Sequence, residues 1–420
     1  MKRTLRSYTL LFCGLIAAYL LFALTANLLP NKPILHHAAK TVDRGDLAAD
    51  FGYMMICRPA YYMDNFTDAL IINQACNGGS NHLLTSMLLN PRVDGGGEQC
   101  ESLRRLTQGD TSLYTLHYGR YWHGSTFAMR FLLLFGDYTS LRILFYLLST
   151  VIMAWVAAVI YRRIGLAATA LYMLAMAMVN VFMMQLSIQF LPVLLIALAA
   201  SLWVLYRVQR PGQLCLLLFA VGSLTAYFDL LTCPMMTWGI PMCVYLLKEH
   251  KGPMCLQPLL RIKNWTVASL LWVVGYGFTW VSKWLIATLL TGENVIRDGA
   301  RQFAIRAGGQ IDYSRWDALA NNLNLLPWPY VALTLCLLAA LAIWRFNRKG
   351  LPTALLCLLT ALPPLAWYLV TADHSYLHYW FTYRSLSVPL MALFFAAVAL
   401  TDWPRLKAAL PSNPFKPKSH

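Results

Sequence analysis

The chain has 420 residues, of which 58% are hydrophobic and only 12% are charged, and its formal net charge is +16. Several apolar runs reach the roughly 20 residues that a helix needs to cross a bilayer, so the composition excludes a water-soluble globular protein and indicates an integral membrane protein. The sequence contains no GxxxxGK[ST] loop, no HExxH pair and no GxSxG turn, so P-loop, zinc-protease and serine-hydrolase chemistry have no local motif.

Ten apolar segments are predicted to span the membrane, in one all-α membrane domain that covers residues 1–420. The first segment follows three basic residues and is long, without a clear small-residue cleavage site, so we interpret it as a retained anchor and not as a signal peptide. Only residues 185–189 join the third and fourth segments, which predicts a tight antiparallel pair. The predicted spans are 8–29, 141–161, 165–184, 189–206, 214–232, 235–247, 264–288, 328–344, 351–371 and 386–402.

Positive charge is distributed unevenly across this predicted membrane. On the side shared by both termini, 18 Lys and Arg residues face only Glu249 and Asp402, which accounts for the whole net charge of +16. Because cytoplasmic loops are enriched in Lys and Arg, both termini and the basic tail at 403–420 are predicted to be cytoplasmic, by default in a bacterial plasma membrane. The basic balance therefore reflects topology and predicts no nucleic-acid partner.

The first outer loop, residues 30–140, is the longest segment between predicted spans. It contains two glycine-rich stretches and an apolar run, Phe127 to Phe135, interrupted by Arg130, which predicts an amphipathic helix at the membrane interface. A second outer loop is predicted at 289–327. Three cysteines of the first loop allow one disulfide whose pairing the sequence does not fix, namely Cys57, Cys76 and Cys100.

Asp64 and Asp68 are the candidate catalytic acids of the first loop, in the sequence Tyr-Tyr-Met-Asp-Asn-Phe-Thr-Asp. If this segment is helical, the two carboxylates share a face one turn apart, and Asp64 stands near the helix start, where a carboxylate is favourable. Two such groups can divide the work of a base and of a substrate or metal ligand. The structural alternative is a helix cap followed by a solvated acid.

Asp229 and Lys283 are ionisable residues at or inside apolar segments. A charge at the centre of a membrane helix costs about 2.5–3.5 kcal/mol on insertion scales, so such a residue usually has a partner or a function. The functional reading is substrate binding by Asp229 and recognition of an anionic lipid headgroup by Lys283. The structural alternatives are a cap or ion pair for Asp229, extension of Lys283 to the membrane surface, or pairing of the two.

A short third outer segment carries His374, His378 and Arg384 among several tyrosines and tryptophans. Its spacing is compatible with phosphate recognition, with a metal site or with an aromatic belt at the membrane interface. Arg120 and His123, in Tyr118-Gly-Arg-Tyr-Trp-His123, form a similar group at the end of the first loop. Arginine is well suited to bidentate binding of phosphate.

These motifs and their layout resemble the C-type glycosyltransferase superfamily. Its members are multi-span enzymes with an acidic first extracytoplasmic loop, and they take sugars from polyprenyl-phosphate carriers. Here the first span, the loop with Asp64-Asn-Phe-Thr-Asp68 and the later segments rich in Arg, His and aromatic residues match that layout over most of the chain. Many members carry adjacent acids or an acid-x-acid pair, whereas three residues separate the aspartates here, so which aspartate is the base stays open.

The resemblance implies transfer of a sugar from a polyprenyl-phosphate donor to a glycan or glycolipid acceptor at the outer face of the membrane. Asp64 would be the general base and Asp68 would assist, through the substrate or an optional Mg²⁺ or Mn²⁺; no cofactor would be required. The alternatives are a transporter or flippase of lipid-linked sugars and a polysaccharide polymerase or ligase. The implied substrate-binding residues are Arg120, His123, Asp229, Lys283, His374, His378 and Arg384, of which Lys283, His378 and Arg384 would hold the leaving phosphate.

Overall fold

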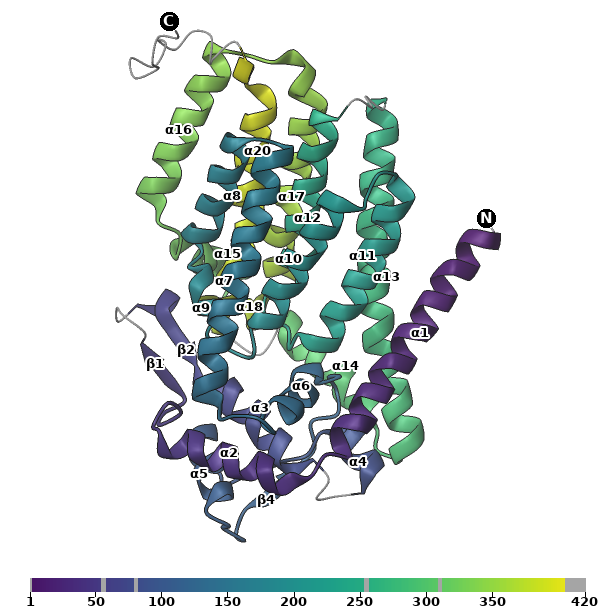
Figure 1. The fold of residues 1–420 in the computed structure, drawn as a ribbon, viewed down its shortest axis with the longest axis vertical. Coiled ribbons are helices and arrows are strands. Elements are labelled where there is room, and N and C mark those ends of the chain that lie inside the picture. Colours follow the sequence, from purple (N-terminus) through teal and green to yellow (C-terminus); the bar gives the residue numbers. More distant parts are fainter. Residues whose placement is uncertain (1, 54–57, 79–81, 253–256, 309–311, 405–420) are drawn as a thin grey trace, which may run out of the picture.

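The computed structural model describes residues 2–53, 58–78, 82–252, 257–308 and 312–404, and these residues are mostly α-helical. Long helices form a bundle along the vertical axis, and a smaller domain from residues 28–137 covers its lower end (Figure 1). We call this lower end the loop end. The opposite end, at which the C-terminus of the chain lies, is called the tail end.

All ten predicted apolar segments contain helix, and six helices or helix runs are long and apolar enough to cross a membrane unaided. A seventh is counted if α15 (Arg315–Asn324) and α16, which meet at 82°, act as one bent span. These findings confirm an all-α architecture typical of integral membrane proteins, whereas ten spans stay a prediction. The bundle helices are α1 (Lys2–Asn27), α7 (Tyr138–Arg163), α8 (Leu166–Met178), α10 (Leu191–Tyr206), α11 (Pro211–Phe228), α12 (Met235–Lys251), α13 (Pro258–Thr291), α16 (Trp328–Trp344), α17 (Leu351–Val370) and α20 (Ser387–Leu400).

Two features of the bundle differ from the sequence prediction. The segment predicted at 264–288 is part of α13, a helix of 34 residues that continues past both predicted limits, because polar residues at helix ends remain helical after the apolar run stops. The predicted tight pair at 165–206 does not form. Instead α8 packs mainly on α7 and α20, and α10 packs on α7, α11 and α12. The short helix α9 (Val181–Met184) and the link that follows it lie at the loop end.

Helices α11 and α13 cross in close contact because a glycine on each faces the backbone of the other. A Cβ atom at Gly222 would lie 2.2 Å from the carbonyl oxygen of Trp272, and one at Gly275 would lie 2.1 Å from that of Phe219. Small residues at such a crossing let two backbones approach closely. The crossing fixes the loop-end half of α13 relative to the turn that follows α11.

The loop-end domain consists of five helices and two antiparallel two-stranded sheets. Phe51 pairs with Asp64 in the first sheet, and Arg92 pairs with Leu116 in the second. Three further short helices at this end, α14, α18 and α19, come from the segments of the chain that connect the later bundle helices. The elements are α2 (Asn31–Asp43), α3 (Asn65–Asn77), α4 (Leu83–Leu89), α5 (Gln99–Thr107), α6 (Gly124–Leu132), β1 (Phe51–Tyr53), β2 (Tyr62–Asp64), β3 (Arg92–Asp94), β4 (Tyr114–Leu116), α14 (Val295–Ala307), α18 (Ala372–Leu377) and α19 (Tyr379–Thr382).

The helix predicted from residue 127 onward corresponds to α6, which begins at Gly124 and is buried against α1, α3 and α11. Its Arg130 is fully buried. The guanidinium donates to the carbonyl oxygens of Ala26 at 2.8 Å and Leu29 at 3.1 Å, and to that of Ala75. Because a buried guanidinium requires several acceptors, Arg130 ties the end of α1 to the end of α3 and so fixes α3 relative to the bundle.

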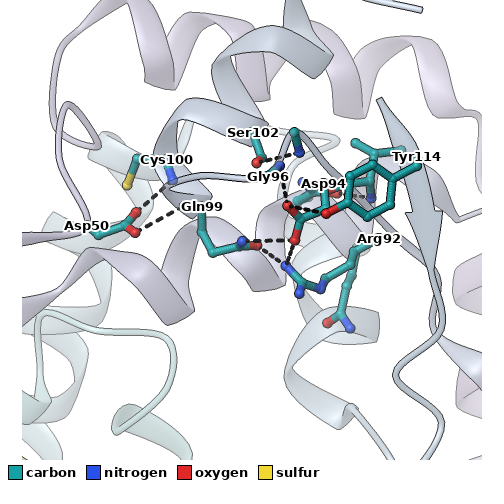
Figure 2. A network of polar contacts seen from close by, with 12 residues as sticks. Asp50, Arg92, Asp94, Gly96, Gln99, Cys100, Ser102 and Tyr114 are labelled. Atoms are coloured by element: carbon teal, nitrogen blue, oxygen red, sulfur yellow. Dashed lines mark hydrogen bonds and ion pairs between the residues drawn. The ribbon is translucent and has the colours of Figure 1, made fainter. Parts of the chain in front are cut away.

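Two aspartates hold the second sheet and α5 together (Figure 2). The carboxylate of Asp50 accepts the backbone N–H groups of Gln99 at 3.0 Å and Cys100 at 2.8 Å, where the helix leaves its N–H groups without internal partners. Asp94 forms an ion pair with Arg92 at 2.9 Å and accepts further hydrogen bonds from Gly96, Gln99 and Tyr114. This network fixes the start of α5 against the rest of the loop-end domain.

The cysteines of the first loop give no disulfide within the described residues. Cys76 and Cys100 are buried free thiols, and Cys57 lies outside the described residues. Asn65-Phe-Thr is an Asn-X-Thr sequence of the kind that can carry a glycan. The amide of Asn65 is buried and donates to the carbonyl oxygen of Ala49 at 3.1 Å, so a glycan does not fit on it in this fold.

Candidate functional site

Asp64 joins β2 to α3 at the loop end of the bundle. Its Oδ1 accepts the backbone N–H of Thr67 at 3.0 Å, which makes Asp64 the N-cap of α3. Its Oδ2 has no hydrogen-bond partner among the described residues, and only 2% of the residue is exposed. One carboxylate oxygen of Asp64 is therefore buried but takes no part in the hydrogen bonds among the described residues.

Asp68 lies on the first turn of the same helix, as the spacing predicts, but its surroundings differ. Its Oδ1 accepts from the Ser187 hydroxyl at 2.9 Å and from the backbone N–H of Gln189 at 3.3 Å. Its Oδ2 accepts from the Tyr138 hydroxyl and faces Arg142 at 3.5 Å. Both oxygens are engaged, so Asp68 anchors α3 to α7 and to the link before α10, with neither oxygen left for a metal ion or substrate.

Burial and the second acid set the protonation of this pair. Burial and, to a lesser extent, the negative charge of Asp68 raise the pKa of Asp64 to about 7, against the opposing effect of the hydrogen bonds from Thr67. Burial also raises the pKa of Asp68, while Arg142, Tyr138 and Ser187 oppose the rise. A carboxylate with a pKa near neutral and a free oxygen has the properties of a general base.

Asp64 and Asp68 line a narrow crevice that has no room for a water molecule. Its other lining residues come from β2, α7 and the end of α9, and its far wall is Phe190. Arg384 lies behind that wall, with its guanidinium carbon 5.3 Å from the centre of the Phe190 ring. The same guanidinium donates to the carbonyl oxygen of Ala60 at 3.2 Å, just before β2. The structure thus brings one late cation next to the early acids.

Asp229 forms a second acidic centre, at the end of α11. Its Oδ1 accepts the backbone N–H of Thr232 at 2.9 Å and the Thr232 hydroxyl, while its Oδ2 has no partner among the described residues. Only 1% of Asp229 is exposed, and burial raises its pKa to about 6 against the opposing hydrogen bonds of Thr232. Leu231 in this turn has a φ of +69°, which is rare for a residue with a Cβ.

His374 holds this turn in place. Its Nε2 donates to the carbonyl oxygen of Leu231 at 2.6 Å, since a carbonyl only accepts. Its ring lies 4.8 Å from that of His378. Burial lowers the pKa of His374 well below its usual value, with the neighbouring His378 and Arg306 adding to it, and burial followed by Arg306 lowers the pKa of His378 to about 4. Both imidazoles are therefore neutral near pH 7 and carry no positive charge toward a phosphate.

The other predicted binding residues lie near the start of α6. His123 adopts a φ of +59° and its Nε2 donates to the carbonyl oxygen of Tyr118 at 2.8 Å; burial, then the charge of Lys283, lowers its pKa to about 3. Lys283 donates to the carbonyl oxygen of Leu88 at 2.8 Å and so does not pair with Asp229. Arg120 pairs with Asp298 at 3.3 Å.

The two acidic centres stand on opposite sides of an aromatic wall. Phe190 borders the Asp64 crevice, and its ring lies 5.4 Å from that of Phe381. Phe381 in turn stacks on His378 at 5.2 Å. The predicted residues are thus gathered at one end of the bundle but divided into an Asp64 centre with Asp68 and Arg384, and an Asp229 centre with His374 and His378.

Several residues of both centres were not predicted. Tyr138, Arg142 and Ser187 hold Asp68, and the only sequence signal among them is the charge of Arg142 at the start of an apolar run. Around Asp229, the residues that were not predicted are Tyr121, Tyr276, Trp280 and Arg306. No group of three or more His, Cys, Asp or Glu residues is arranged to hold a metal ion within the described ranges.

The chain matches no protein-family model, no curated protein and no solved structure.

Proposed function

We propose that the chain is a membrane glycosyltransferase that moves a sugar from a polyprenyl-phosphate donor to a glycan or lipid-linked acceptor at the outer face of the membrane. One observation carries this proposal. The buried Asp64 keeps one carboxylate oxygen without a partner among the described residues, at the end of the bundle opposite the basic tail end. Lys and Arg gather at the cytoplasmic side of membrane proteins, which supports an outer location for Asp64.

In the proposed reaction, the free oxygen of Asp64 takes the proton of an acceptor hydroxyl. The acceptor oxygen attacks the anomeric carbon, a new C–O bond forms, and the bond from that carbon to the phosphate oxygen breaks with inversion. Polyprenyl phosphate leaves with the bonding electron pair, and its negative charge requires a cation. Arg142 lines the crevice but is paired with Asp68, so Arg384, which contacts Phe190 of the crevice lining, is the cation proposed for this role; the neutral His378 is not suited to it.

Asp68 and Arg142 have a supporting role in this scheme. Asp68 fixes α3 through its four contacts, and its negative charge keeps the neighbouring Asp64 more basic than a lone carboxylate. The crevice is closed, so binding of a sugar requires it to widen. The side chains of Met63 and Leu186 line it and are unbranched at Cβ, which lets them change rotamer at small cost.

An apolar groove supports a lipid-linked donor. It has a volume of about 330 Å³, and α6, α7, α10 and Phe228 line it with apolar atoms. Ile188 of this groove follows Ser187, a partner of Asp68, and Phe228 precedes Asp229. A polyprenyl chain in the groove would therefore have its phosphate end close to both acidic centres.

The distribution of buried ionisable residues favours chemistry at one face over transport across the bilayer. Among the described residues, the buried Asp, Arg, Lys and His side chains lie at the loop end, with the single exception of Arg261 in the first turn of α13. A transporter or flippase of lipid-linked sugars would need polar groups along the whole path.

Release of free polyprenyl phosphate by the full chain in proteoliposomes tests the proposal, because this leaving group is common to all donors of the class. The donors would be polyprenyl-phosphate glucose, mannose and galactose, with an envelope glycan extract as acceptor. We expect release from at least one donor together with a mass increase of one hexose in the glycan. Movement of the intact donor between leaflets without release would support the flippase instead.

A further inference from the structure

A set of buried polar atoms without hydrogen-bond partners surrounds the Asp229 centre. Among the described residues, Asp229 Oδ2, His123 Nδ1, the Tyr276 hydroxyl and Trp280 Nε1 are all buried and unpartnered. Folded proteins pair nearly all of their buried polar groups. Four such atoms from α6, α11 and α13 at the same end of the bundle therefore require an explanation beyond the stability of the fold.

Ring contacts and a hydrogen bond link these residues into one patch. The Tyr121 ring lies 5.9 Å from that of His123 and 5.2 Å from that of Trp280, and the Trp280 ring lies 5.9 Å from that of Tyr276. Asp229 joins the patch through the residue before it, because the carbonyl oxygen of Phe228 accepts from the hydroxyl of Ser125, two residues after His123, at 3.1 Å. The patch is thus built on the aromatic side chains at the outer end of α13.

The hydrogen-bonding character of the four atoms is mixed. Asp229 Oδ2 accepts, and His123 Nδ1 also accepts, because Nε2 of that ring already donates to a carbonyl oxygen. The Trp280 indole nitrogen only donates, and the Tyr276 hydroxyl does both. A phosphate diester offers acceptors only, and any phosphate anion is repelled by a carboxylate. Hydroxyl groups donate and accept, so they complement all four atoms.

The surroundings of the patch also match a hydroxylated ring. Tyr121, Tyr276 and Trp280 offer flat apolar faces on which the C–H face of a sugar can pack. Arg306 of α14 adds a planar donor, with its guanidinium carbon 5.5 Å from the centre of the Tyr121 ring. Helix α14 lies close on α13, since Gly299 faces the Trp284 ring with no room for a Cβ.

We propose that Asp229, His123, Tyr276 and Trp280 form a second ligand site, distinct from the Asp64 crevice, that binds a neutral sugar by its hydroxyl groups. Within the proposed function, on which this assignment rests, the site holds a sugar of the acceptor glycan other than the one whose hydroxyl Asp64 deprotonates. The aromatic wall of Phe190 and Phe381 separates it from the crevice where the donor reacts, so the two acids bind different parts of the reacting pair.

Saturation-transfer NMR on the full chain in nanodiscs tests the site with methyl glucoside, methyl mannoside and methyl galactoside as probes. We expect ring-proton signals from at least one glycoside. Asp229→Asn keeps the oxygen that caps Thr232 but turns the free acceptor into a donor, so it should weaken binding by at least about tenfold. Tyr276→Phe removes only a hydroxyl and should weaken binding about fivefold.

Two matched variants serve as controls. Tyr172→Phe removes another buried, unpartnered hydroxyl, which lies on α8 away from the patch, and it should leave binding unchanged. Asp64→Asn changes the other half-used acid and should abolish release of polyprenyl phosphate while glycoside binding persists. Melting curves followed by tryptophan fluorescence verify that each variant is folded.

The outcomes separate the two proposals. Glycoside binding that depends on Asp229 and Tyr276, without any release of polyprenyl phosphate, would support the sugar site and remove the glycosyltransferase assignment. No signal from any of the three glycosides, or a signal that Asp229→Asn and Tyr276→Phe leave unchanged, would overturn the sugar site. Displacement of the glycoside by inorganic phosphate would overturn it as well, since it would indicate an anion site.

Discussion

Asp50 and Asp94, in the network of Figure 2, and Asp64 and Asp229, in the two candidate centres, are used in different ways. In the network of Figure 2, both oxygens of Asp50 and both oxygens of Asp94 have hydrogen-bond or ion-pair partners. Asp64 and Asp229 are at least as buried, yet each has one oxygen with a partner and one without among the described residues. Each of these two acids caps its own turn with one oxygen only.

The oxygen without a partner distinguishes Asp64 and Asp229, the candidates for chemistry, from Asp50 and Asp94, which stabilise the fold. A buried polar atom without a partner costs about 1–3 kcal/mol, and more when it is charged. A fold retains that cost only where the surrounding contacts fix the residue, and such positions are typical of functional sites. Here Arg130 fixes α3 below Asp64, and His374 fixes the strained turn at Leu231 beside Asp229.

The largest expected effect is that of Asp64→Asn. Asparagine is also a good N-cap, so α3 should persist, while loss of the base should lower release of polyprenyl phosphate by about 10²–10⁴-fold. The raised pKa means that the folded state holds the proton more tightly than the unfolded chain, so stability from this group is lost as pH rises through about 7. The neutral variant should therefore melt higher than the wild type at about pH 8.5, by a smaller margin at about pH 5, and equally only at about pH 3, below the ordinary pKa of an aspartate in the unfolded chain. Full activity of this variant would remove Asp64 from the mechanism.

Asp50→Ala should show the opposite pattern. Two N–H groups at the start of α5 lose a charged acceptor, so the free energy of unfolding should fall by about 2–4 kcal/mol. Denaturation in detergent, followed by circular dichroism, measures the loss. Activity per folded molecule should stay within about threefold of the wild type, since Asp50 only supports the domain. An unchanged stability would contradict the structural role of the Figure 2 network.

Asp68→Asn sharpens the comparison, because Asp68 is fully partnered but adjacent to the crevice. Asp64 acts as a carboxylate, so activity should be present above about pH 7 and lost as pH falls through that value. Removing the negative charge of Asp68 lowers the pKa of Asp64, so the midpoint of the pH–rate profile should move to lower pH. A profile that stays in place in a folded variant would show that the two acids are not coupled.

The smallest expected effect is that of Ser187→Ala. It removes one of four contacts of Asp68, so the free energy of unfolding should fall by about 1 kcal/mol. The rate of polyprenyl phosphate release should be nearly unchanged, because the other three contacts still hold Asp68. Urea denaturation of the reconstituted protein gives the stability change, and a loss of activity beyond about tenfold would instead place Ser187 at the reacting atoms.

Much of the fold was predictable from the sequence, because apolar length is a strong signal in a membrane protein. Each of the ten apolar segments contains helix, and the position of Asp64 at the start of α3 was also foreseen. The predicted pairing of the third and fourth segments was wrong. A short link keeps two helix ends close together but does not make the helices pack along their length. Here the link contacts Asp68 through Ser187 and Gln189, and the two helices pack on other partners.

The candidate site was predictable only in part. Residue types and spacing identified Asp64, Asp229, His374 and Arg384 as candidates, but they did not predict that an aromatic wall divides them. They also did not predict that Asp68 would be fully engaged, because its partners Tyr138 and Arg142 stand about 70 residues later in the chain. Contacts between distant segments depend on tertiary packing, which periodicity and composition do not encode.

The most direct test measures melting temperature and polyprenyl phosphate release in parallel for Asp64→Asn and Asp94→Asn in the same proteoliposomes. Both variants replace a buried carboxylate of the loop-end domain by an amide of equal size. We predict that Asp64→Asn remains folded and loses release, whereas Asp94→Asn melts at a lower temperature and keeps release per folded molecule. Equal loss of release in both variants, or normal release with Asp64→Asn, would contradict the assignment of chemistry to the half-used acid.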